Sequence, residues 1–267
     1  METFSLTHPA TGAVPILLSV PHCGTFVPQD LKGEFVPEKI SDQDDTDWFV
    51  DRLYDFAPAM GITLLTANIS RWVIDLNRTP ENQPLYSDGR VITGLCPVTD
   101  FLGNPLYADK RISVEQSEID RRKYLYFYPY HRQVLLTLEK MKDEFGKVLL
   151  WDCHSIRRMV TSIRKDPFPD LILGDADGAS ALPGLSEITL RNLEGDNRSV
   201  AHNEPFKGGY ITRHYGKPAE SIHALQLEMS KVNYMDDGER NYDPARADRI
   251  REKLKRNFEE LINTLMS

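Results

Sequence analysis

The chain has 267 residues, and 32 Lys and Arg against 40 Asp and Glu give it a formal net charge of −8. A chain of this length can bury a large core, so we expect one domain spanning residues 1–267. The net negative charge repels phosphate backbones and anionic lipid, which excludes nucleic acid and membrane surfaces as expected partners.

Three widely spaced cysteines occur in the chain, and an odd number in a protein too large to need stapling indicates a reducing compartment without disulfides. No basic leader precedes a long apolar run, and Ile16–Val20 is far shorter than the roughly 20 residues of a membrane span. We therefore expect a soluble, cytoplasmic protein, whose oligomeric state the sequence does not indicate.

The first half of the chain contains two strand patterns and one helix pattern. The continuous apolar run Ile16–Val20 predicts a strand covered on both faces, and residues 62–67 predict a second strand. Residues 45–47 precede apolar residues at helical spacing, which predicts a helix that starts there and ends before Pro58. Residues 72–74 lead into Asp75-Leu76-Asn77-Arg78, and residues 79–112 look like a long, functional loop.

The second half alternates helices and strands. Residues 114–145 are helical, with Pro129 suited to the first turn of a second helix. Strands are predicted at 148–151, 170–173 and 222–228, with a helix after Pro183 and an amphipathic helix closing the chain. This order predicts an α/β fold, a three-layer α/β/α sandwich with a mostly parallel central sheet. Active sites gather beyond the carboxyl ends of such strands, where His22, Asn77 with Arg78, and His154 fall.

The two strand-end histidines, His22 and His154, are candidate zinc ligands. A catalytic zinc site takes three protein ligands and leaves a position open, although a single histidine at a strand end more often only packs or hydrogen-bonds. The carboxylate ligand should be Asp45 or Asp47, and the alternative for either is a helix cap. Spacing does not choose between them; we favour Asp45, with Asp47 as the substitute. Iron, cobalt or manganese could also occupy such a site.

Glu228 is the candidate general base. In residues 224–229, alternation puts Gln226 and Glu228 on one face of a strand, where a carboxylate is costly to bury unless it is paired or metal-linked. The alternative is a structural ion pair with Lys or Arg.

Three arginines near these elements, Arg71, Arg78 and Arg213, predict a small acidic substrate. Planar guanidinium groups bind carboxylates through two parallel hydrogen bonds, and glycines flank the Arg213 segment as in a loop that approaches a ligand. Each arginine taken singly could equally be a surface charge.

A cysteine nucleophile is a further interpretation, because His22-Cys23 and Cys153-His154 are adjacent pairs. Neighbours in an extended segment point to opposite faces, so neither pair can form the required hydrogen bond. Only cross pairing, Cys23 with His154 or Cys153 with His22, stays open.

Six ordered segments of the chain together resemble the N-formylglutamate amidohydrolase family, which removes the formyl group in histidine degradation. They are Ser19–Gly24, Asp45–Trp48, Ser70–Arg71 with Asp75–Arg78, Trp151–Ile156, Lys207–Gly216 and His223–Ser230. The family is similar to the zinc carboxypeptidase, aspartoacylase and succinylglutamate desuccinylase group. The resemblance therefore implies their phosphorylase/hydrolase-like fold and zinc-dependent hydrolysis of N-formyl-L-glutamate to glutamate and formate.

The resemblance also implies roles for individual residues: His22 and His154 as metal ligands, Glu228 as general base, Asn77 and Arg78 as contacts to substrate or oxyanion, and Arg213 as a clamp on a substrate carboxylate. Related hydrolases carry a glutamate ligand three residues after the first histidine, where this chain has Thr25. The third ligand must then come from elsewhere, hence Asp45 or Asp47. The nearest alternative function is a deacylase of another acidic N-acyl amino acid, and a binding protein that has lost catalysis is a different class.

Overall fold

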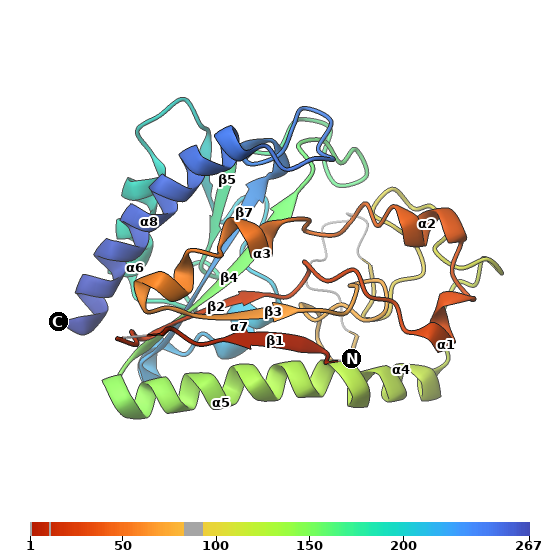
Figure 1. Cartoon of the computed structure of the whole chain (residues 1–267), viewed down its shortest axis with the longest axis horizontal. Helices are drawn as coiled ribbons and strands as arrows, with labels where there is room; N and C mark the ends of the chain where they lie inside the picture. The colour runs from red at the N-terminus through yellow and green to blue at the C-terminus, as the bar shows by residue number, and fades with distance from the viewer. Residues whose placement is uncertain (1, 11, 83–92) are drawn as a thin grey trace.

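The computed structural model describes residues 2–10, 12–82 and 93–267, which form a seven-stranded mixed sheet with helices (Figure 1). The strands are β1 Phe4–Thr7, β2 Ile16–Val20, β3 Thr63–Ala67, β4 Val148–Ile156, β5 Leu171–Gly174, β6 Val200–His202 and β7 Ile222–Ser230. The α-helices are α1 Gln29–Lys32, α2 Pro37–Ser41, α3 Val50–Leu53, α4 Gln116–Arg122, α5 Tyr128–Phe145, α6 Pro183–Leu193, α7 Tyr210–Tyr215 and α8 Pro244–Met266. Short 3₁₀ segments are η1 Ala57–Met60, η3 Pro218–Glu220 and η4 Lys231–Asn233, and a π-helical segment, η2 Lys123–Phe127, joins α4 to α5.

The sheet has the strand order β1-β3-β2-β4-β7-β5-β6. β3, β2, β4 and β7 run parallel to one another, and β5 pairs parallel with β6. β1 and β5 run antiparallel to β3 and β7. Because β2, β4 and β7 are parallel neighbours, their carboxyl ends meet at one edge of the sheet, where polar side chains can converge.

Two apolar clusters pack on the central strands, and side-chain alternation separates them. In β4, Leu149 and Trp151 belong to a cluster with residues of α3, α6 and α8, whereas Val148 and Leu150 belong to a cluster with residues of α5 and α7. Figure 1 shows α5 along the bottom of the view and α6 with α8 at the upper left. Apolar residues therefore pack on both faces of β4, which explains the unbroken apolar runs in β2 and β4.

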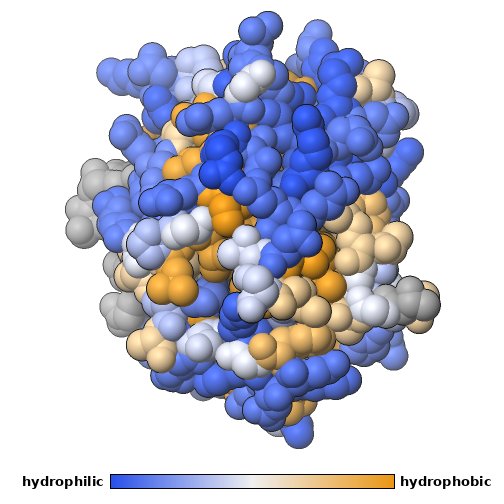
Figure 2. Space-filling view, turned by 90° about the vertical axis from the view of Figure 1, so that its left-hand side faces the viewer, coloured by the Kyte–Doolittle hydropathy of each residue, from blue (hydrophilic) through white to orange (hydrophobic). Residues whose placement is uncertain are grey.

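Figure 2 shows one side of the molecule as mostly hydrophilic, with apolar residues gathered in a smaller area near its middle. Within the described residues, no helix has the length and hydropathy needed to cross a bilayer.

Most predicted strands and helices are found, with shifts at their ends. β2 matches its prediction, the strand predicted at 148–151 extends to Ile156 and so includes His154, and Pro129 lies in the first turn of α5. The pattern at 72–74 forms a turn, closed by a hydrogen bond from Val73 N to Ser70 O. The strands β1 and β6 and the helix α7 were not predicted. Residues 83–92 of the predicted long loop lie outside the described part of the chain.

The helix predicted to start at residues 45–47 is wrong at its beginning. α3 covers only Val50–Leu53, and Phe49 before it has a left-handed φ of 63°. The backbone N–H of Asp47 donates to His22 O at 3.0 Å, so this segment makes a tertiary hydrogen bond in place of a helical one. The acidic segment is therefore a loop held against the end of β2.

Candidate active site and metal centre

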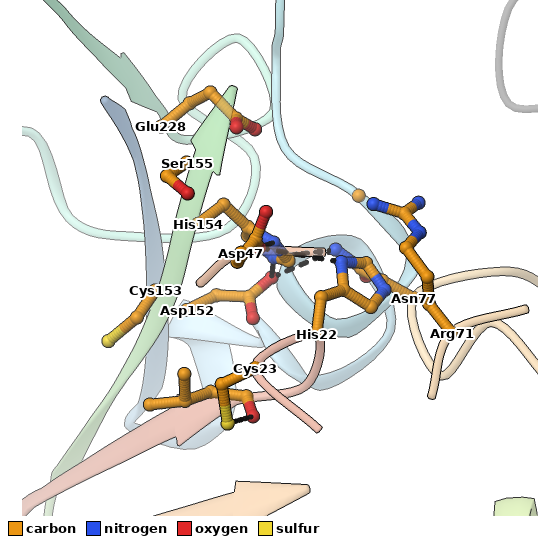
Figure 3. A network of polar contacts seen from close by, with 12 residues as sticks. His22, Cys23, Asp47, Arg71, Asn77, Asp152, Cys153, His154, Ser155 and Glu228 are labelled. Carbon is orange, nitrogen blue, oxygen red and sulfur yellow. Dashed lines mark hydrogen bonds and ion pairs between the residues drawn. The ribbon is translucent and has the colours of Figure 1, made fainter. Parts of the chain in front are cut away.

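Three side chains from separate elements converge at the carboxyl edge of the sheet: His22 after β2, Asp47 in the loop before α3, and His154 in β4 (Figure 3). All three are buried, with exposed fractions of 1–3%. Residues 22 and 154 meet because β2 and β4 are parallel neighbours, with Ser19 opposite Asp152. The convergence of the two histidines is what the sequence predicted.

The atoms facing one another in this cluster have the spacing of metal ligands. Asp47 Oδ2 lies 3.2 Å from His154 Nδ1 and 3.7 Å from His22 Nδ1, and ligand atoms of all three residues lie within 4.8 Å of one another. Bonds of about 2.1 Å in a tetrahedral arrangement place two ligand atoms ~3.4 Å apart, so a zinc-sized ion fits. Within the described residues, His22 Nδ1 is buried without a hydrogen-bond partner, which is consistent with a ligand atom of a metal site.

Behind the cluster, a carboxylate contacts the second nitrogen of each imidazole. His22 Nε2 lies 2.7 Å from Asp75 Oδ1, and His154 Nε2 lies 3.1 Å from Asp152 Oδ2. A carboxylate at one ring nitrogen holds the proton there, which leaves the lone pair of the other nitrogen free for a cation. The Nδ1 atom of each ring, which faces Asp47, is therefore the nitrogen available to a cation that displaces any proton there.

The pKa values of Asp75 and His154 are shifted by the charged side chains around them. Burial alone would raise the pKa of Asp75, but the cations Arg71 and Arg78 hold it well below its ordinary value. Burial would lower the pKa of His154, yet Asp152 and Asp47 raise it well above its ordinary value. In the metal-free protein a proton on His154 thus supplies positive charge among carboxylates, a role that a divalent cation can take over.

The structure corrects the preference for Asp45 as the carboxylate of this cluster. Asp45 Oδ2 instead accepts hydrogen bonds from Trp72 Nε1 at 3.1 Å and from Phe101 N at 3.0 Å. Burial raises the pKa of Asp45 to about 6. The two aspartates are two positions apart in an irregular loop, and their side chains meet different partners: Asp47, the substitute, joins the histidines.

Glu228 lies in β7 directly opposite His154 in β4. Its side chain is half-buried, and burial raises its pKa to about 8 even though His154 acts to lower it. Figure 3 shows its carboxylate above His154, on the same side of β4 as the two imidazoles. Gln226, on the same face of β7, places Nε2 3.5 Å from Glu228 Oε2 and accepts from Gly209 N at 2.7 Å.

Asn77 contacts the histidine side of the cluster. Its Nδ2 lies 2.9 Å from His154 Nε2 and 3.2 Å from Asp152 Oδ2, while its Oδ1 accepts from Ile211 N at 2.7 Å. A Cβ atom added at Gly209 would lie 2.3 Å from Asn77 Nδ2, so glycine is required where this loop crosses the site. A contact of Asn77 with substrate stays a prediction.

The three predicted arginines have different surroundings. Arg71 is buried and donates to Asp75 Oδ2 at 2.6 Å, and Arg78 donates to Thr93 O at 3.1 Å with Asp75 Oδ2 3.8 Å away. Arg213 lies on α7 with an exposed side chain that donates to Gly208 O at 2.8 Å. Their roles in substrate binding stay predictions.

The cysteines do not form the cross pairs that would support a nucleophile. Cys23 Sγ contacts Val20 O and Ala67 O at 3.5 and 3.4 Å, and Cys153 Sγ contacts Trp151 O at 3.7 Å. Burial raises both thiol pKa values well above the ordinary range. Figure 3 shows both sulfur atoms pointing away from the imidazoles, so thiolate chemistry is not supported here.

Sequence reasoning assigned no role to Asp75, Asp152 or Gln226. Asp152 carried a usable signal, because alternation in a strand places it on the same face as His154. Asp75 carried only its position in the segment Asp75–Arg78, since its contact with His22 joins segments 53 residues apart.

Comparisons with known proteins agree with one another. A protein-family model described as N-formylglutamate amidohydrolase matches residues 14–235. The chain is 43% identical over 231 residues to the N-formylglutamate deformylase of Pseudomonas aeruginosa, which covers 85% of this chain and 84% of the relative. It is 40% identical over 232 residues to the N-formylglutamate deformylase of Pseudomonas putida, with the same coverage of each chain.

Solved structures extend the likeness over the whole chain. The crystal structure of N-formylglutamate amidohydrolase from Ralstonia eutropha JMP134 superposes with a TM-score of 0.84 at 29% identity, covering 99% of this chain and 98% of the other. A gene product from Agrobacterium tumefaciens, at 19% identity and a TM-score of 0.73, shares the fold over 98% of this chain and 96% of its own.

Proposed function

Since the chain belongs to the N-formylglutamate amidohydrolase family, we propose that it hydrolyses N-formyl-L-glutamate to L-glutamate and formate with a divalent metal held by His22, Asp47 and His154. The two Pseudomonas relatives, 40 and 43% identical, bear the name N-formylglutamate deformylase, which supports the reaction. The observation that carries the proposal is the buried His–Asp–His cluster with a carboxylate behind each imidazole. The reaction would be the formyl-removing step of histidine degradation.

Zinc is the metal we propose, because two imidazoles and one carboxylate are a common catalytic zinc ligand set. Another divalent transition metal could take the same nitrogen and oxygen ligands, since affinity alone does not select among them. A bound divalent ion supplies Lewis-acid activation of the formyl carbonyl and of the attacking water. Asp75 and Asp152 keep both imidazoles oriented for it.

Glu228 would move the protons of the reaction. The half-buried carboxylate accepts a proton from the attacking water and returns it to the departing amine of glutamate. Burial has already raised its pKa to about 8, which suits a group that must both accept and release a proton near neutral pH. Gln226 contacts Glu228 and the Gly209 loop, so it holds the base toward the cluster.

Arginines would recognise the two substrate carboxylates. Arg71 and Arg78 lie around Asp75, beside the cluster, and Arg213 extends from α7 next to the glycine loop. Guanidinium groups at these places would select an acidic substrate on an acidic protein, and Asn77 would contact the substrate or its oxyanion.

We also propose an architecture, a domain organisation and a location for the protein. We propose the three-layer α/β/α arrangement, on the strength of apolar clusters on both faces of the sheet. We also propose one domain over 1–267, because α8 contributes to the same cluster as β2 and β4. A cytoplasmic location is proposed from the three free cysteines.

The test compares a panel of N-acyl amino acids after metal removal and after metal return. Purified protein is stripped with a chelator, reloaded with zinc, and assayed for formate or free amine with N-formyl-, N-acetyl- and N-succinyl-glutamate and with N-formyl-aspartate. We expect metal-dependent turnover that is fastest with N-formylglutamate. Faster cleavage of an acetyl or succinyl compound would favour the alternative deacylase, and full activity of the metal-free protein would refute the metal mechanism.

A further inference from the structure

A buried lysine, Lys231, lies against the loop that carries Asp47. It is 2% exposed and follows directly after β7. Its Nζ donates to Thr46 O at 2.8 Å and to Asp44 O at 3.2 Å, and lies 5.1 Å from the ring centroid of Trp48. Three residues of the loop therefore surround one ammonium group, and its hydrogen bonds go to carbonyl groups rather than to a carboxylate.

The peptide group that precedes Asp47 is held at both ends. Its carbonyl, Thr46 O, accepts from Lys231, and its N–H, on Asp47, donates to His22 O at 3.0 Å. Because a peptide group is planar, two hydrogen bonds of opposite direction fix its orientation. The backbone position of Asp47 is thus set relative to the other ligand segment, at His22, and to the end of β7.

We propose that Lys231 is a positioning residue for the metal centre: it holds the Thr46–Asp47 peptide so that the Asp47 carboxylate faces the two imidazoles, and it thereby sets the affinity for the metal. This inference rests on the proposed function. Burying an ammonium group is costly unless hydrogen bonds compensate, and an apolar side chain would fill the same space without that cost. What the ammonium adds is the pair of carbonyl contacts on the Asp47 loop.

The same lysine connects two parts of the site. Glu228 lies three residues before Lys231 at the end of β7, so the strand that carries the proposed base also anchors the proposed carboxylate ligand. A shift of the Asp47 loop relative to β7 would move the ligand and the base apart. The hydrogen bonds of Lys231 to Thr46 O and Asp44 O tie the Asp47 loop to the end of β7.

A second buried lysine offers a matched control. Lys253 in α8 is 4% exposed and donates to Leu193 O at 2.8 Å, Glu194 O at 2.7 Å and Asn192 O at 3.4 Å, with Asp196 3.5 Å away. It therefore makes the same kind of contact, an ammonium on backbone carbonyls, at the end of α6 and on no segment of the site. Losing Lys253 should cost stability without moving Asp47.

The experiment compares Lys231→Met and Lys253→Met with wild type in the full chain. The free energy of unfolding of the metal-free proteins is measured with denaturant, and the Zn²⁺ dissociation constant by competition with a chromophoric chelator. We expect both variants to lose stability, and Lys231→Met alone to bind Zn²⁺ about 10- to 100-fold more weakly, as for loss of other groups that orient metal ligands. Excess Zn²⁺ should restore most of its turnover.

A Zn²⁺ dissociation constant for Lys231→Met within about twofold of wild type, or an equal weakening in Lys253→Met, would overturn the positioning role. If Lys231→Met does not fold, Lys231→Leu, which also removes the donor to Thr46 O and Asp44 O, is measured against the same threshold. Wild-type protein that binds no Zn²⁺ would instead refute the proposed metal-dependent function, so the two failures are distinguishable.

Discussion

Exchanging the carboxylate of Asp47 or of Asp45 for an amide separates a metal ligand from a structural acceptor. Asp47 Oδ2 lies 3.2 and 3.7 Å from the two Nδ1 atoms, so Asp47→Asn replaces an anionic oxygen at the proposed metal position by a neutral amide. Asp45 Oδ2 accepts from Trp72 and Phe101, contacts that an asparagine oxygen can keep in Asp45→Asn. The two variants remove the same charge from the same loop.

The expected losses of Zn²⁺ affinity in Asp47→Asn and Asp45→Asn differ by about two orders of magnitude. Loss of a group that only orients a ligand costs about 10- to 100-fold in metal affinity, so loss of a direct ligand should cost at least about 100-fold, or roughly 2.7 kcal/mol. Asp45→Asn should change the Zn²⁺ dissociation constant by less than about twofold, since Asp45 contacts neither histidine. Its cost should appear as about 1 kcal/mol of stability through weaker hydrogen bonds.

Chelator competition with Zn²⁺ checks both values, and denaturant unfolding of the metal-free variants shows that each is folded. Equal Zn²⁺ affinity of wild type and Asp47→Asn would refute the assignment of Asp47 to the metal. A large loss of affinity in Asp45→Asn would mean that this carboxylate reaches the metal after all.

Three further predictions concern neighbouring parts of the site and the core. Glu228→Gln should lower kcat by about 10²- to 10⁴-fold with the Zn²⁺ affinity nearly unchanged, and normal turnover in stopped assays would rule Glu228 out as the base. Asp152→Asn should weaken Zn²⁺ binding about 10- to 100-fold by freeing the His154 ring, more than Thr212→Val, which removes one hydrogen bond to Asp152; equal Zn²⁺ titrations would contradict this. His131 is buried with its pKa lowered to about 3 by burial, so its neutral form stabilises the fold above the ordinary value of 6.5 and that contribution is lost as the pH falls below it. Between pH 6.5 and about 5 the wild type should lose roughly 2 kcal/mol that His131→Gln does not, and parallel pH profiles of unfolding free energy would disprove this.

The core elements could be predicted because their pattern is local. β2, β4, β7 and α8 show apolar runs or helical spacing within their own residues. An unbroken apolar run is enough to predict a strand that is buried on both faces. The edge strand β1 has only four residues that alternate between half-buried and exposed, a pattern too short to stand out. α7 lies between glycines that look like loop residues, and its buried Ile211 and Tyr215 become apparent only against the α5 cluster.

In the site, the positions of two histidines and a glutamate at the ends of strands could be read from local apolar runs, because the ends of parallel neighbours meet at one edge of a sheet. The identity of the aspartate that joins them depends on tertiary contacts. Asp45 and Asp47 have the same local pattern, and the choice depends on hydrogen bonds to Trp72 in one case and to His22 and Lys231 around the other. Those partners come from distant segments, so the direction of each carboxylate is a property of the packed loop and not of its spacing.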